Sequence, residues 1–239
     1  AAKVTVRQLL NFTSGMGDFF GERFDATPKD RLRDNRDFLP LFAPDPLLFE
    51  PGRSQQYSNA GYVVLGLIVE KRSGKSYYDA VREAVYSPAG MKDTDSYMAD
   101  APTPNLAEGY TAQWDGKEHP GEPLRANVYS RPARGSAAGG GYSTAEDLLR
   151  FAAALKGGTL LTKPYSDWVL GGPEPGASAE NSPPPPGWPM AAFAGGAPGI
   201  NAQVALEGEV TVVVLANLDP PAAGRVAQKV TRWARGLPK

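Results

Sequence analysis

Apolar residues recur at helical spacing through the first two thirds of the chain. Short helices are predicted over residues 5–12, 27–38 and 76–85, and Thr27-Pro28 supplies an N-cap and a first helical residue for the second of them. The strongest pattern covers residues 58–71, ends before Gly74 and is apolar on nearly every side. A helix of that kind is typically buried, so we expect it inside the fold.

One further helix follows a long irregular stretch. Residues 99–142 show no regular pattern, whereas residues 143–146 (STAE) form a capping box that opens a helix ending at Gly157-Gly158. Residues 171–189 are rich in proline and glycine and are predicted to form a loop.

The last third of the chain changes to strand patterns. Strands are predicted over 190–194, 202–207 and 209–216, and turns at Pro198-Gly199 and Gly208 favour antiparallel pairing. A closing helix over 222–234 places Val226, Val230 and Trp233 on one stripe. The predicted fold class is α+β, with an antiparallel three-stranded sheet flanked by helices. We expect one incomplete domain over 1–239, mostly helical over 1–185, with the strands and the last helix in 186–239.

The strand over 209–216 is apolar on both faces, which is typical of a central strand. If it forms a hairpin with 202–207, its other edge has no partner nearby in the sequence. An exposed apolar edge invites aggregation, so we expect additional strands from outside this sequence to pair there. The alternative is that the N-terminal segment or a loop covers the edge.

Composition excludes several classes of protein. The chain has a net charge of −1, one histidine and no cysteine. The lack of basic excess argues against nucleic acid as a partner, and no thiolate catalysis or thiolate metal site is possible. No stretch approaches the roughly 18 apolar residues of a membrane helix. His119 lies in a polar segment and is interpreted as an exposed loop residue, so we expect no metal, no cofactor and no Ser-His-Asp triad.

Tyr57 and Asn59 stand two residues apart where the strongest helix begins. A tyrosine whose pKa is lowered can act as a general base toward a hydroxyl nucleophile. An asparagine amide can bind a substrate carbonyl. The alternative is local, with Ser58 or Asn59 capping the helix and Tyr57 packing beside it, and the tripeptide alone favours this alternative.

Five segments that occur in a fixed order favour the catalytic interpretation of Tyr57 and Asn59 over the local one. They are residues 4–15 (VTVRQLLNFTSG), 49–62 with the pattern F-x-P-G…Y-S-N-x-G-Y, 88–94 (PAGMKDT), 139–148 (GGGYSTAEDL) and 195–199 (GGAPG). Together they cover nearly the whole chain and resemble the serine β-lactamase family. That family includes class C β-lactamases, D-alanyl-D-alanine carboxypeptidases and related esterases, and the resemblance implies a β-lactamase/transpeptidase-like fold.

The resemblance implies three catalytic elements. The first, Ser-x-x-Lys, supplies the serine that is acylated, and no serine of this chain has lysine three residues later. In the family this element precedes the segment matched by residues 4–15. We therefore expect this chain to begin after it, and an N-terminal segment to carry both the nucleophile and the first strands. The second element, Tyr-x-Asn, is matched by Tyr57, as a general base or proton shuttle, and Asn59, as a ligand of the substrate amide.

The third element is Lys-Thr-Gly, or His-x-Gly in the esterase-like branch, and aligns with Phe193-Ala194-Gly195. Phenylalanine carries no charge and donates no hydrogen bond, so recognition of a substrate carboxylate is in doubt and neutral esters are favoured. Gly196 still offers a backbone N–H for an oxyanion hole.

Other candidates are interpreted as structural. Ser14 lies in a glycine turn, Ser143 fits an N-cap, and Phe12 stands where the family commonly has histidine. Surface or loop positions are assigned to Glu50, Asp93 and Asp95.

The favoured function is a serine hydrolase that cleaves a small-molecule ester or amide through an acyl-serine intermediate, and this chain alone is predicted to be inactive. The alternative is a non-catalytic homologue that acts as a binding or scaffold protein. A metal hydrolase is disfavoured by the residue counts. The resemblance implies a periplasmic or secreted location.

Overall fold

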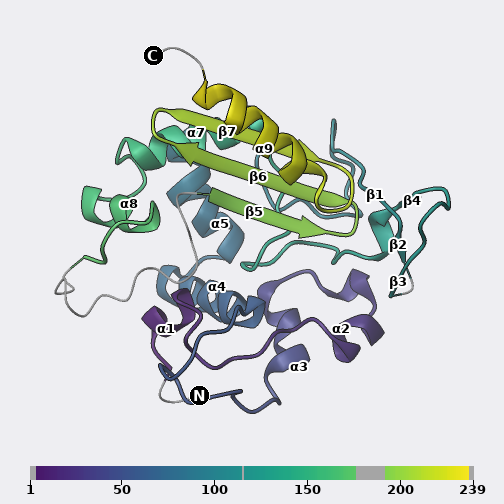
Figure 1. Ribbon diagram of the computed structural model, residues 1–239. Coiled ribbons are helices and arrows are strands. Elements are labelled where there is room, and N and C mark those ends of the chain that lie inside the picture. The colour runs from purple at the N-terminus through teal and green to yellow at the C-terminus, as the bar shows by residue number, and fades with distance from the viewer. Residues whose placement is uncertain (1–3, 115, 176–191, 237–239) are drawn as a thin grey trace. The chain divides into compact units, whose positions relative to one another are not determined.

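The computed structural model describes residues 4–114, 116–175 and 192–236 (Figure 1). They fall into two compact units whose segments interleave along the chain. Unit 1 comprises Ala1–Glu83, Asp95–Pro102 and Pro132–Gly141, and unit 2 comprises Ala84–Thr94, Thr103–Arg131 and Tyr142–Lys239. The boundary expected between residues 185 and 186 lies outside the described residues.

Unit 1 is built from short helices around one long helix. Its elements are α1 (Val6–Leu10), α2 (Glu22–Ala26), η1 (Lys29–Arg31), η2 (Asn35–Phe38), α3 (Leu39–Phe42), α4 (Asn59–Ser73) and α5 (Tyr77–Val81). Their apolar side chains form one core of aromatic and aliphatic residues: Phe19, Phe24, Leu32, Phe38, Leu41, Phe42, Ala60 and Val63.

The continuous helix predicted over 27–38 is wrong. The segment forms the two 3-10 helices η1 and η2 instead. The side chain of Asp37 accepts the backbone N–H groups of Arg33 and Asp34, each at 2.8 Å. A short acidic side chain that bonds nearby backbone in this way competes with a continuous helix, and it starts a new turn at Asn35.

Helix α4 confirms the strongest helical prediction. It begins after Ser58, whose hydroxyl accepts the Gly61 N–H at 3.0 Å, and it ends at Gly74 in the left-handed conformation. Its burial is less complete than the pattern predicted. Ala60, Gly61, Val63 and Gly66 are buried, the other faces are partly covered, and Val69 is 38% exposed. A row of small residues lets neighbouring segments pack closely on one side only.

The helix predicted over 76–85 is shorter and less regular than expected. Helix α5 continues into a π-helical turn at Arg82–Tyr86, which passes into unit 2, and then into α6 (Ser87–Ala89). Tyr78 is the buried residue of α5, whereas Ala84 in the π-helical turn is exposed.

Unit 2 holds the sheet. Its elements after α6 are β1 (Tyr110–Thr111), β2 (Gln113–Trp114), β3 (Lys117–Glu118), β4 (Arg125–Ala126), η4 (Asn127–Tyr129), α7 (Ala145–Lys156), α8 (Lys163–Val169), β5 (Ala192–Ala197), β6 (Ile200–Glu207), β7 (Val210–Ala216) and α9 (Ala222–Arg235). The short strands confirm that most of residues 99–142 are irregular. Helix α8 was not anticipated.

The three long strands form an antiparallel sheet in the order β5-β6-β7, as predicted (Figure 1). Strand β5 extends to Ala197, further than the expected 190–194, and residues 190–191 lie outside the described part. Helix α7 packs on the face that carries Val204 and Val213. Helix α9 covers the opposite face, where Val212 is buried (Figure 1).

Strand β7 lies at an edge of this sheet within the described residues. Leu215 on this strand is 39% exposed. On α9 the buried residues are Ala223 and Ala227, while Val226 and Trp233 are 49% and 69% exposed. The predicted apolar stripe is therefore not the buried face of α9, because the two alanines allow the close approach to the sheet.

Helix α7 begins one residue later than the predicted capping box. Thr144 is the N-cap and accepts the Asp147 N–H at 3.1 Å. In the described part of the chain, no helix is long and apolar enough to cross a membrane.

Candidate functional site

Tyr57 and Asn59 are positioned by two loops of unit 1 that run side by side. The backbone N–H groups of Leu48, Gly52 and Gln56 donate to carbonyls of the segment 12–15 at 2.7–2.9 Å. Gly15 has a φ of 77°, and a Cβ at this residue would lie 2.2 Å from the carbonyl oxygen of Phe49. The glycine of the Thr-Ser-Gly motif is therefore required by the close approach of the loop that leads to Tyr57.

Ser58 fixes the start of α4 between these polar residues. Its side chain is 1% exposed, and its hydroxyl donates to the Gly17 carbonyl at 2.6 Å while capping the helix. Tyr57 is 62% exposed, and its hydroxyl donates to Asn59 Oδ1 at 3.2 Å. The structure therefore brings the two predicted residues together at the N-terminus of a 15-residue helix.

Asp18 is a member of this group that the sequence reasoning missed. Its Oδ2 accepts the backbone N–H of Asn59 at 3.1 Å and the Asn59 Nδ2–H at 2.8 Å. The available signal was its place three residues after the glycine of the Thr-Ser-Gly motif, although nothing in that spacing specifies a partner 41 residues away.

The electrostatics of Tyr57 differ from those of a general base. Partial burial of the phenol and the nearby Asp18 carboxylate both raise the pKa of Tyr57 above its ordinary value. The lowered pKa considered in the sequence analysis is not found in this chain. Phe12 is buried and packs between the rings of Tyr57 and Tyr62, at centroid distances of 4.8 and 5.3 Å.

In unit 2, Phe193 lies on the face of the sheet that is covered by α7. Its ring packs against Phe151 at 5.9 Å and belongs to the cluster around Val204 and Leu206. The residue that aligns with the polar position of the third motif is thus part of a hydrophobic core.

Gly195 and Gly196 follow on the exposed end of β5. A Cβ on Gly195 would meet nothing within 4 Å, whereas one on Gly196 would lie 2.6 Å from Pro220 Cγ. Asn201 supports this end of the strand, since its Nδ2–H donates to the Gly195 carbonyl at 2.9 Å and its Oδ1 accepts the Ala223 N–H at 2.8 Å.

The turn after Gly196 is held by two polar side chains. Asp219 accepts the backbone N–H of Gly199, the hydroxyl of Thr111 and the backbone N–H of Ala112, each at 2.7 Å. Asn127 donates from Nδ2 to the Pro198 carbonyl at 2.8 Å. Burial raises the pKa of Asp219, but the three hydrogen bonds together lower it by more than burial raises it. The pKa therefore lies below its ordinary value. These contacts fix the turn that ends β5.

The two serines considered as internal nucleophiles are engaged elsewhere. Ser14 is 1% exposed, and its Oγ accepts the Met16 N–H at 3.2 Å. Ser143 is not the helix cap and shares a 2.8 Å hydrogen bond with Thr94 Oγ1. Thr94 and Asp93 are both bound by the buried Asp147, through the threonine hydroxyl at 2.8 Å and the Asp93 backbone N–H at 2.7 Å.

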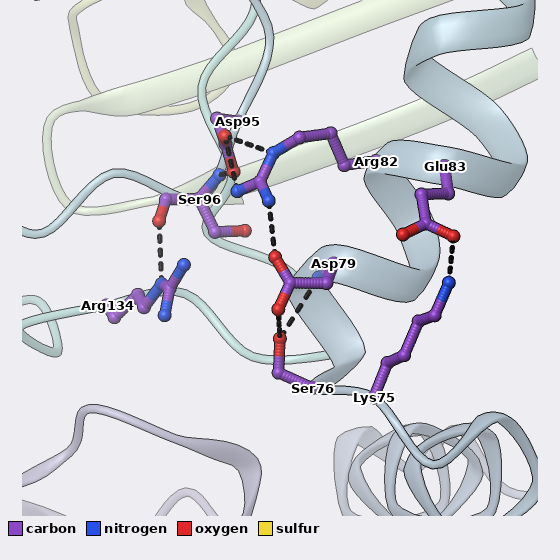
Figure 2. Close-up of polar contacts among 8 residues, drawn as sticks. All are labelled: Lys75, Ser76, Asp79, Arg82, Glu83, Asp95, Ser96 and Arg134. Atoms are coloured by element: carbon purple, nitrogen blue, oxygen red, sulfur yellow. Dashed lines mark hydrogen bonds and ion pairs between the residues drawn. The ribbon is translucent and has the colours of Figure 1, made fainter.

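The acidic residues assigned to the surface differ from one another. Glu50 is exposed and pairs with Arg53 at 3.7 Å, and Asp93 is exposed. Asp95 is only 19% exposed and accepts two hydrogen bonds from Arg82, at 2.8 and 3.0 Å (Figure 2). Asp95 does lie in a loop, but its side chain is paired rather than free at the surface, which the sequence analysis did not anticipate.

The same polar network includes three further residues. Arg82 also pairs with Asp79, and Arg134 donates to the Ser96 carbonyl at 2.7 Å (Figure 2). The network ties Asp95, at the start of the segment 95–102 of unit 1, to the turn that follows α5.

His119 is partly buried rather than exposed, because its ring stacks on Trp114 at 4.1 Å. Its Nδ1 lies 3.3 Å from Glu122 Oε1. Among residues 4–114, 116–175 and 192–236, no group of three or more metal-ligating side chains occurs.

Comparison with known proteins gives a consistent result. The Beta-lactamase family model matches residues 1–235. The chain is 41% identical over 96 residues to penicillin-binding protein 4* of Bacillus subtilis, covering 39% of this chain and 21% of that protein. It is 32% identical over 175 residues to esterase EstB of Burkholderia gladioli, covering 64% and 44%. The chain thus spans less than half the length of these two relatives.

Solved structures share the fold. A penicillin-binding protein from Bacillus halodurans superposes with a TM-score of 0.80 at 30% identity, over 97% of this chain and 74% of that one. A D-amino acid amidase from Ochrobactrum anthropi superposes with a TM-score of 0.70 at 24% identity, over 98% and 74%.

Proposed function

The chain belongs to the beta-lactamase family, and we propose that it forms part of a serine hydrolase that cleaves a small ester or amide through an acyl-serine intermediate. The observation that carries the proposal is the hydrogen-bonded pair of Tyr57 and Asn59 at the start of α4. Tyr57 serves as the proton-transfer group, and Asn59 binds the amide or ester carbonyl of the substrate.

The nucleophile comes from a segment outside this sequence. No serine here has lysine three residues later, Ser14 is buried, and Ser143 is hydrogen-bonded to Thr94. The raised pKa of Tyr57 supports this assignment, because a tyrosine that keeps its proton needs an additional cation before it can act as a base. The Ser-x-x-Lys element would supply both the serine and that cation.

Gly196 contributes a backbone N–H to the oxyanion hole, and Gly195 leaves room for the substrate beside it. Clamping of the following turn by Asp219 and Asn127 supports this role, since an oxyanion donor must be held rigidly to be effective. Phe193 supplies no cation at the position where the family has lysine or histidine, because its ring packs against Phe151. Neutral esters are therefore the favoured substrates over anionic β-lactams, and nucleic acid is not a substrate.

The test compares this chain with a longer protein that includes the Ser-x-x-Lys segment, using p-nitrophenyl butyrate. Turnover is expected only in the longer protein, and Tyr57→Phe should reduce it by about 10²- to 10⁴-fold. Tyr62→Phe is the matched control, because Tyr62 also contacts Phe12 but lies outside the pair. Equal turnover by this chain alone would contradict the proposal. Nitrocefin hydrolysis faster than ester hydrolysis would contradict the substrate preference.

A second candidate is a non-catalytic homologue, and the packing of Phe193 into the core favours it. The two candidates differ in covalent labelling. An active-site serine in the longer protein should react with a fluorophosphonate, and mass spectrometry locates the label. Absence of both label and turnover would contradict the hydrolase and favour the non-catalytic homologue.

The proposed location is periplasmic or secreted, on family resemblance. Fractionation of cells that express the longer protein tests it, and recovery in the cytosolic fraction would contradict it.

A further inference from the structure

We propose that Asp18 is a positioning residue that fixes the amide of Asn59 and thereby holds Tyr57 as a proton donor. The orientation of the amide stands on contacts within unit 1. Its catalytic consequence rests on the proposed function.

The first step concerns how firmly Asp18 is held. Its Oδ1 accepts the backbone N–H of Phe20 at 3.1 Å, and its Oδ2 accepts the backbone N–H and one Nδ2–H of Asn59. Both carboxylate oxygens are thus engaged, one by its own loop and one by α4. The side chain therefore ties the loop after the Thr-Ser-Gly motif to the first residue of the helix.

The second step concerns the direction of the hydrogen bonds. An ionised carboxylate can only accept, whereas an asparagine amide has one accepting and one donating end. Asp18 therefore draws Asn59 Nδ2 toward itself, which turns Oδ1 toward the Tyr57 hydroxyl at 3.2 Å. A flipped amide would place its oxygen against the carboxylate. Asn59 Oδ1 can stabilise a protonated phenol, but it has no hydrogen to offer a phenolate.

The third step concerns charge. The Asp18 carboxylate and partial burial both act against ionisation of Tyr57. The amide direction and the nearby charge therefore favour the same state, in which Tyr57 keeps its proton at neutral pH. The other Nδ2–H of Asn59 has no acceptor among the described residues. It is available to a substrate carbonyl.

The first experiment needs no activity. In protein labelled with 15N-asparagine, Asp18→Asn should shift the side-chain amide resonances of Asn59, because the carboxylate that accepts its Nδ2–H is replaced by a neutral amide. Asn201 is the control, because its Nδ2–H donates to a backbone carbonyl. Asn59 resonances that are identical in the variant and the wild type would overturn the proposal.

The second experiment follows the ionisation of Tyr57 by 13Cζ-tyrosine NMR, with Tyr57→Phe for assignment. Asp18→Asn should let Tyr57 titrate at a lower pH than in the wild type. Asp25→Asn, which removes an exposed charge of the same unit, should leave it unchanged. Identical titration in both variants would contradict the role of Asp18.

The third readout is turnover by the longer protein, where Asp18→Asn should lower kcat about tenfold through misorientation. NMR shifts as expected without any esterase activity would support the amide orientation and contradict the proposed function. Esterase activity together with an Asn59 amide that is insensitive to Asp18 would support the proposed function and contradict the positioning role of Asp18.

Discussion

The ring of Phe193 packs against that of Phe151 at a centroid distance of 5.9 Å and an interplanar angle of 73°. This edge-to-face contact joins β5 to α7 on one face of the sheet. A position that aligns with lysine or histidine in the catalytic motif of the family thus contributes to the stability of unit 2.

The first prediction concerns this contact. Phe193→Ala should lower the free energy of unfolding by about 2 kcal/mol, less than for a fully buried ring, because contacts with Phe151 and Val204 are lost. Phe193→Leu, which keeps most of the apolar volume, should cost less than half as much. Urea unfolding measures both, and equal costs would show that the apolar volume of this side chain is not what stabilises unit 2.

The second prediction concerns the two glycines of β5. Gly196→Ala should destabilise the protein by about 1–3 kcal/mol, because the new methyl group would meet the Pro220 ring at 2.6 Å. Gly195→Ala should be nearly neutral, since nothing lies within 4 Å of its Cβ position. Thermal unfolding of the pair provides the comparison, and a similar loss in both variants would count against the steric explanation.

The third prediction concerns pH. The pKa of Asp219 is lower in the folded protein than its ordinary value, so the unfolded chain binds a proton more readily. The stabilisation is fully present above about pH 4, near the pKa of an unfolded aspartate, and it is lost as pH falls through the lower folded pKa. Asp219→Asn should therefore cost about 1–3 kcal/mol at pH 7, through three weakened hydrogen bonds.

The cost of the same variant should shrink as pH falls through the lowered pKa of Asp219, because the wild-type carboxylate then takes up a proton. Urea unfolding at pH 7 and at a series of acidic pH values checks this trend. A cost that is independent of pH would show that the ionised carboxylate is not what stabilises the turn at Gly199.

The fourth prediction compares two ion pairs near α5 (Figure 2). Arg82→Ala should destabilise unit 1 by about 1 kcal/mol, because it removes a paired donor from Asp95, which is only 19% exposed. Lys75→Ala should change stability by less than about 0.5 kcal/mol, since Lys75 and Glu83 are 47% and 60% exposed. Arg82→Ala should remain the more destabilising of the two variants at high salt. A larger loss of stability in Lys75→Ala would contradict the prediction.

Local patterns predicted those elements whose stability is local. The helix after Ser58 was anticipated because its hydroxyl cap, apolar run and C-terminal Gly74 are all adjacent in the chain. The antiparallel sheet was anticipated for the same reason, since two short turns connect its strands. The segment after Thr27 was mispredicted, because the side chain of Asp37 redirects the backbone in a way that helical spacing does not reveal.

The residues of the candidate site also differ in whether local sequence reveals them. Tyr57 and Asn59 could be found from the sequence because they are two residues apart at a helix start and match a family motif. Asp18 could not be found, because its bonds to Asn59 depend on the packing of the Gly15 loop against residues 48–52. Asp219 was likewise missed, since it gathers donors from segments more than 100 residues away in sequence.

The sequence by itself determined the family, the order of the strands along the chain, and the absence of a Ser-x-x-Lys element among these 239 residues. These properties are set by residue identity and spacing alone. Only the tertiary structure decided the hydrogen-bond direction of Tyr57, the packing of Phe193 and the pairing of Asp95. Each depends on which donors, acceptors and rings the folded chain brings within contact distance, and on how far burial removes them from water.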